Sequence, residues 1–113
     1  MASSPDYDAL AIALSSAADW LNELADNGPD LRVNAHLKAA HEARELADDP
    51  TPIEAADVLI CLVGTALQQG WTMGDLAHAV SHKVRVNATR TWVRQPDGTW
   101  QHDTPIPSDV GAP

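Results

Sequence analysis

Four acidic residues in the middle of the chain have the types and the spacing of a metal site. Glu42 and Glu45 lie three apart in the string HEAREL, and Glu54 and Asp57 lie three apart in the string EAADVLICLV. Residues three apart on a helix share a face, so each pair would present two carboxylates in one direction. Only the turn 48–51 separates the two helices expected here. They should therefore pack as antiparallel neighbours, with one pair facing the other.

Four carboxylates brought together need a counter-charge. Two unit charges about 5 Å apart repel by about 3 kcal/mol at an effective dielectric constant of 20. Divalent cations would offset this repulsion, and ligand sets made only of oxygen favour Mg²⁺ or Mn²⁺ over zinc or copper. The sequence therefore predicts a Mg²⁺ site, in which Mn²⁺ can substitute, and its ligands are Glu42, Glu45, Glu54 and Asp57.

Each acid also has an explanation without a metal. Glu42 and Glu45 fit a solvated helix face with ordinary i,i+4 neighbours. Glu54 fits a capping box, with Thr51 as the N-cap three residues earlier. Asp57 lies in the most apolar run of the chain, where a buried Asp could instead pair with a core Arg or a helix amide. Since burying an unpaired carboxylate is costly, we expect Asp57 to be the deepest ligand of the cluster.

A second group of polar residues lies in the string HKVRVNATRTW. Lys83, Asn87 and Arg90 are four and then three apart, which keeps them on one face of a helix. Lys and Arg supply cationic donors for phosphate oxygens, and the amide of Asn87 can bond to a base, a sugar or a phosphate. Cations near a helix C-terminus are also favoured by the dipole, so ordinary surface residues would show the same pattern.

Four helical segments would position these residues. They are marked by Pro and Gly punctuation and lie at about 5–27, 35–47, 51–69 and 72–90. The string TWVRQPDGTWQHD then predicts a hairpin around a Pro-Asp-Gly turn, across which Trp92 and Trp100 could pair. The fold class expected is all-α, a four-helix bundle-like domain over residues 1–92, with a short β-hairpin and a Pro-rich extended tail over 93–113.

Composition limits the partners. Lys and Arg total 7 against 16 Asp and Glu in 113 residues, a formal charge of −9, which argues against binding to nucleic acid. No stretch approaches the length of a membrane span, and the start MASSPDYD does not read as a signal peptide. Cys61 is the only cysteine and is expected to fill the core. A cytoplasmic protein with no membrane partner is therefore expected.

The order of these motifs resembles the MazG-like family of all-α nucleoside triphosphate pyrophosphohydrolases. The strings that carry the resemblance are EARELADDPTPIEAADVLI, GWTMGDLAHAVSHK and NATRTW, over about residues 37–92. They look most like the short phage and bacterial members, including the phage MazZ type that trims purine deoxynucleotides. The resemblance implies a homodimer or homotetramer, working in the host cytoplasm if the chain is phage-encoded. It also implies Mg²⁺-dependent cleavage of an NTP or dNTP between its α and β phosphates, giving the monophosphate and pyrophosphate.

The resemblance also implies roles for particular residues. Glu42, Glu45, Glu54 and Asp57 match the metal-binding acids, Lys83 and Arg90 match phosphate contacts, and Asn87 matches a polar contact to the nucleotide. Glu42 or Glu45 is the candidate catalytic base that positions the attacking water. Trp20, with Asn34, is a candidate surface for the base, although a core Trp would read the same way. The alternative function is a catalytically silent helical module that binds a nucleotide, a metal or another protein.

Overall fold

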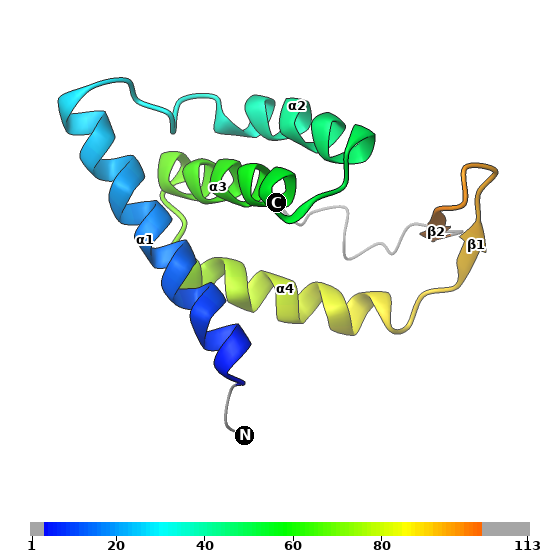
Figure 1. Ribbon diagram of the computed structural model, residues 1–113. Coiled ribbons are helices and arrows are strands. Elements are labelled where there is room, and N and C mark those ends of the chain that lie inside the picture. Colours follow the sequence, from blue (N-terminus) through cyan, green and yellow to red (C-terminus); the bar gives the residue numbers. More distant parts are fainter. Residues whose placement is uncertain (1–3, 103–113) are drawn as a thin grey trace. The chain divides into compact units, whose positions relative to one another are not determined.

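The computed structural model describes residues 4–102, and all four expected helices are present (Figure 1). They are α1 (Pro5–Asn27), α2 (Ala35–Asp48), α3 (Pro52–Gln69) and α4 (Met73–Asn87), followed by the strands β1 (Trp92–Arg94) and β2 (Trp100–His102). The predicted all-α fold with a short C-terminal hairpin is confirmed. The Pro-rich tail expected near the end of the chain lies outside the described residues. In the described range, no helix combines the length and the apolar character needed to cross a membrane.

The chain separates into two compact units. The first ends at Gly74 and holds α1, α2 and α3, and the second begins at Asp75 and holds most of α4 and the hairpin. The sequence-based boundary between residues 92 and 93 is a different division and stays a prediction.

The start of α3 is fixed by its own sequence. Thr51 is the N-cap, and its Oγ1 accepts a hydrogen bond from the backbone N–H of Glu54 at 3.3 Å. Pro52 occupies the first turn, where its missing N–H costs nothing. Gly70 ends the helix with φ 79°, a left-handed conformation that glycine adopts without strain. These signals place Glu54 in the first turn of α3.

Helices α2 and α3 lie side by side and run in opposite directions, as expected (Figure 1). The approach is close because Gly64 has no side chain: a Cβ built there would lie 3.1 Å from the Cβ of Ala35. The buried apolar residues of the described chain are few and mostly small, namely Leu21, Ala35, Cys61, Val63 and Ala66. The expected core position of Cys61 is confirmed.

The hairpin forms around the predicted turn. Gly98 has φ 90°, and its N–H donates to the carbonyl of Gln95 at 2.9 Å. Asp97 Oδ1 accepts hydrogen bonds from the backbone N–H and the hydroxyl of Thr99, and these bonds lower the pKa of that carboxyl.

The register of the hairpin corrects one expectation from the sequence. Trp92 is paired with His102, and Trp100 is paired with Arg94, so the two tryptophans are not opposite each other. The rings of Trp92 and His102 meet edge to face, with centroids 6.1 Å apart. The prediction of a Trp92–Trp100 pair was wrong because the turn closes at Gln95, whose N–H donates to the carbonyl of Thr99, and this closure places Arg94 opposite Trp100.

Candidate active site

Three of the four predicted metal ligands come together at the α2–α3 contact. One carboxylate oxygen each from Glu42, Glu54 and Asp57 lies within 4.8 Å of the other two. Helix α2 contributes Glu42, and the first two turns of α3 contribute the other two acids. We call these three residues the acidic cluster.

The depth of the three acids differs from the expectation. Glu42 is the most buried, with 9% of its surface exposed, Glu54 is half-buried, and Asp57 is exposed. The expectation that Asp57 is the deepest ligand was wrong. It assumed that the apolar run around Asp57 is enclosed, but Leu59 and Leu62 in that run are 39% and 48% exposed in the single chain.

Glu54 has a buried oxygen that the protein leaves without a hydrogen bond. Its backbone N–H serves the helix cap by donating to Thr51, but its Oε2 has no hydrogen-bond partner in the described part of the chain. A buried carboxylate oxygen without a donor is unfavourable unless something else binds it. An oxygen-only set of three acids, one of which carries this orphaned atom, fits a hard divalent cation. The helix cap uses the backbone N–H of Glu54 and not its carboxylate, so the cap does not compete with metal binding for the same atoms.

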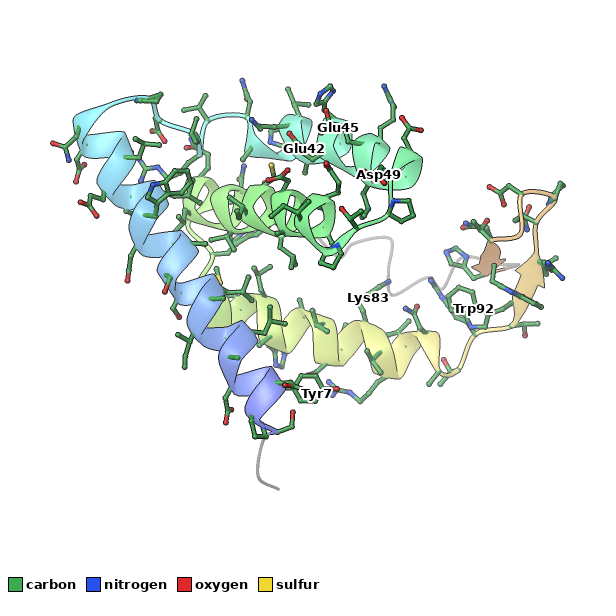
Figure 2. All side chains as sticks on the ribbon, viewed as in Figure 1. Tyr7, Glu42, Glu45, Asp49, Lys83 and Trp92 are labelled. Carbon is green, nitrogen blue, oxygen red and sulfur yellow. The ribbon has the colours of Figure 1, made fainter. Side chains whose placement is uncertain are left out.

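Glu45 is not part of the acidic cluster. Its side chain, labelled on α2 in Figure 2, is 49% exposed. Its Oε1 lies 3.3 Å from Nε2 of His41, one turn earlier on the same helix. Its predicted role as a metal ligand or base stays a prediction.

Lys38 is a charged residue near the acidic cluster that the sequence analysis did not select. Burial raises the pKa of the Cys61 thiol, the positive charge of Lys38 lowers it, and the negative charges of Glu42 and Asp57 raise it further. Lys38 and two cluster acids therefore lie within electrostatic reach of one sulfur atom. The sequence feature that could have identified Lys38 is its position four residues before Glu42, which places both residues on one face of α2.

The second unit holds the predicted phosphate contacts. Lys83 is exposed on α4 (Figure 2), and Asn87 and Arg90 are half-buried. Helix α4 ends at Asn87, three residues earlier than expected, and Arg90 lies in the following turn, where its backbone N–H donates to the carbonyl of Asn87 at 3.2 Å. The helical spacing used to group the three residues thus applies to Lys83 and Asn87 only. Asn87 Oδ1 is buried and has no hydrogen-bond partner among the described residues.

The two predicted base contacts are Trp20 on α1 and Asn34, which directly precedes α2. Trp20 is 49% exposed and borders an open hollow on α1 with Glu23, Leu24 and Asn27. Asn34, which is not part of this lining, precedes α2 with φ 56°, and its side chain makes no capping bond.

Comparisons with known proteins identify a family and two relatives that this chain resembles. A family model described as dATP/dGTP pyrophosphohydrolase matches residues 14–109. The dATP/dGTP diphosphohydrolase of Cyanophage S-2L is 34% identical over 96 residues, which cover 78% of this chain and 86% of the relative. A solved structure of the Cyanophage S-2L MazG-like pyrophosphohydrolase, bound to dGDP and three catalytic Mn²⁺ ions per active site, has a similar fold. Its TM-score is 0.63 at 25% identity, and the match covers 85% of this chain and 94% of that one.

Proposed function

Because the chain belongs to the dATP/dGTP pyrophosphohydrolase family, and is therefore a MazG-like hydrolase, we propose that it acts on purine deoxynucleoside triphosphates. The proposed reaction converts dGTP or dATP to the monophosphate and pyrophosphate, by water attack and cleavage between the α and β phosphates. We propose Mg²⁺ as the physiological ion, with Mn²⁺ able to replace it. The similar phage protein binds Mn²⁺ and dGDP, which supports a divalent ion and a purine deoxynucleotide as ligands.

The observation that carries this proposal is the acidic cluster with its orphaned oxygen. Glu42, Glu54 and Asp57 would hold the divalent ion through carboxylate oxygens. When bound there, the ion supplies charge neutralisation for phosphate oxygens and lowers the pKa of a coordinated water. Metal binding also gives a partner to the buried Oε2 of Glu54.

Glu42 and Glu45 divide the two roles that the acids of α2 must fill. Glu42 is buried against α3 and within the acidic cluster, so its carboxylate suits metal binding. Glu45 is half exposed and contacts His41, so its carboxylate is better placed to accept a proton from the attacking water as general base. The imidazole of His41 would hold the Glu45 carboxylate in a fixed orientation.

The cationic and amide groups would bind the rest of the nucleotide. Lys83 offers three donors to phosphate oxygens, and Arg90 offers a bidentate fork. The unpaired Oδ1 of Asn87 supports a polar contact to the nucleotide. Trp20, with a half-exposed indole beside an open hollow, and Asn34 are proposed as base contacts.

A homodimer or homotetramer is proposed as the working form. Leu21 is the one large side chain of the described residues that is fully buried, whereas Leu59 and Leu62 on α3 remain substantially exposed. Association of chains would bury such apolar surface. Light scattering after size-exclusion chromatography tests this proposal, and a monomer at micromolar concentration would contradict it.

The activity is tested by incubating the purified protein with each of the four dNTPs and with Mg²⁺ or Mn²⁺, then resolving the products. Phosphorus NMR distinguishes pyrophosphate plus monophosphate from orthophosphate plus diphosphate. We expect pyrophosphate, release that depends on the metal, and loss of release in Asp57→Asn. The matched control is Asp49→Asn, an acid just past the end of α2 that is outside the acidic cluster. Release of orthophosphate, or equal loss in both variants, would overturn the assignment.

A further inference from the structure

One face of the hairpin carries four side chains that suit a nucleobase. Residues opposite each other in an antiparallel pair lie on the same face, and so do residues two apart in a strand. The register therefore places Trp92, Arg94, Trp100 and His102 on one face and leaves Val93 and Gln101 on the other. All six residues are exposed.

The aromatic groups on this face are not equally available. Trp92 is 38% exposed, its ring meets the edge of His102, and its Nε1 donates to the carbonyl of Asn87 at 3.2 Å. Trp100 is 58% exposed and has only Arg94 directly opposite. Trp92 thus anchors the hairpin to the end of α4, whereas Trp100 is the more exposed of the two indoles and is opposite Arg94 in the register.

The charge of this segment is opposite to that of the rest of the chain. Residues 83–102 contain four of the seven Lys and Arg, at positions 83, 85, 90 and 94, and a single acid, Asp97. Residues 1–82 contain the other three cations and 13 acids. Asp97 is at the tip of the turn, where its carboxylate is occupied by Thr99. The segment therefore suits an anionic ligand with a flat aromatic part.

We propose that the face formed by Trp92, Arg94, Trp100 and His102 is a nucleobase-stacking surface that favours purine nucleotides. The base stacks on the indole of Trp100, and the guanidinium of Arg94 bonds to the purine edge or stacks beside it. A purine gives a larger stacked area than a pyrimidine, so this surface contributes to base preference. The inference rests on the proposed function for its substrate, and it offers Trp100, in place of Trp20, as the residue that stacks the base. The bond from Trp92 to the carbonyl of Asn87 joins this surface to the end of α4, which holds the proposed phosphate contacts.

The test compares Trp100→Ala, Trp100→Phe and Val93→Ala in the full-length protein. Val93 is a matched control because it is exposed on the opposite face of the same hairpin. Two readouts are used: KM and kcat for dGTP and dCTP, and the affinity for dGMP by calorimetry without metal. We expect Trp100→Ala to raise KM for dGTP and weaken dGMP binding about tenfold or more, with little change in kcat. Trp100→Phe should retain most of the affinity, and Val93→Ala should behave as wild type.

Unchanged KM and dGMP affinity in Trp100→Ala, in a protein that cleaves dGTP, would overturn the inference and leave the proposed function intact. The converse result is also informative. If the wild-type protein cleaves no dNTP but binds dGMP, and Trp100→Ala loses that binding, the stacking surface is supported and the proposed activity is refuted. If Trp100→Ala unfolds, Arg94→Gln gives the same test on the opposite strand. A ten-residue deoxythymidine oligonucleotide is the last probe. If it binds more tightly than dGTP and Trp100→Ala weakens that binding, the face binds single-stranded DNA, and the proposal that its ligand is a mononucleotide is overturned.

Discussion

Ala35 of α2 and Gly64 of α3 meet so closely that a Cβ on Gly64 would lie 3.1 Å from the Cβ of Ala35. Glu42 lies seven residues after Ala35, and Asp57 lies seven residues before Gly64. Seven residues are about two helical turns, so in antiparallel helices the same two faces that meet at Ala35 and Gly64 also present Glu42 and Asp57. The glycine contact therefore sets the spacing of the acidic cluster.

The first prediction concerns this contact. Replacing Gly64 with Val should lower the free energy of unfolding by about 1–3 kcal/mol, because the added methyl groups force α2 away from α3. The same displacement should weaken Mn²⁺ binding by separating Glu42 from the two acids of α3. Thermal melts and calorimetric titration with Mn²⁺ measure the two effects.

Gly74→Ala is the matched control. The nearest atom to a Cβ at Gly74 is 3.5 Å away, an ordinary contact, and the position lies in the first turn of α4. Alanine there should leave stability unchanged or raise it by about 0.5–1 kcal/mol, since glycine is the poorer helix former. A Gly64→Val protein as stable as wild type would contradict the role given to the glycine.

The acids show how far sequence reasoning reaches. Spacing within each helix and the short turn between the helices were enough to bring Glu42, Glu54 and Asp57 together, because helical periodicity is local. The order of burial was not predictable, since it depends on how neighbouring helices enclose the apolar run. Glu45 lies three residues after Glu42, but its carboxylate contacts His41 instead of joining the acidic cluster. No feature of the sequence shows which of the two acids of α2 joins the cluster.

The end of α4 shows the same limit. The helix was expected to reach Arg90, because no Gly or Pro interrupts the pattern before Trp92. It ends at Asn87 instead, where the carbonyl accepts hydrogen bonds from Arg90 N–H and Trp92 Nε1 rather than continuing the helix. The competing partner is a side chain beyond the helix, so its effect could not be read from helical propensity.

The second prediction concerns charge repulsion in the acidic cluster. Glu42→Gln should raise the melting temperature of the metal-free protein by a few degrees, because it removes a buried charge close to two others. With saturating Mn²⁺ the order should reverse, since wild type gains binding free energy that the variant has lost. Melts with EDTA and with Mn²⁺ give both comparisons. Equal shifts in the two conditions would show that Glu42 has no part in metal binding.

The third prediction is a pH dependence at the α1–α2 connection. Arg32 Nε donates to Asp30 Oδ1 at 2.8 Å and Nη2 donates to Oδ2 at 2.9 Å, and Nη1 reaches Asn22 Oδ1 at 3.0 Å. The side-chain hydrogen bonds from Arg32 lower the pKa of the Asp30 carboxyl below its ordinary value of 3.8. Asp30 is therefore more acidic in the folded state, so its contribution to stability is present above that value and is lost as the pH falls through the lowered pKa.

Asp30→Asn should consequently melt below wild type at neutral pH, and the difference should shrink as the pH falls below about 4. The effect should be small because both side chains are partly exposed. The control is a double-mutant cycle with Arg32→Gln. In the Arg32→Gln background, Asp30→Asn should cause little pH-dependent change in melting temperature, because the guanidinium partner of Asp30 is absent. A difference between wild type and Asp30→Asn that stays constant from neutral to acidic pH would exclude the ion pair as its cause.

The fourth prediction separates the two roles of Glu54. Thr51→Ala removes the hydroxyl that accepts the Glu54 N–H, so it should lower the free energy of unfolding by about 1 kcal/mol and leave the carboxylate in place. Glu54→Gln keeps the same backbone bond but replaces the charged oxygens, so it should change stability little and weaken Mn²⁺ binding markedly. Denaturant melts and Mn²⁺ titration of both variants give four values. Comparable loss of Mn²⁺ affinity in the two proteins would mean that Glu54 acts through the helix start. Loss confined to Glu54→Gln would establish its carboxylate, with the unpaired Oε2, as a ligand.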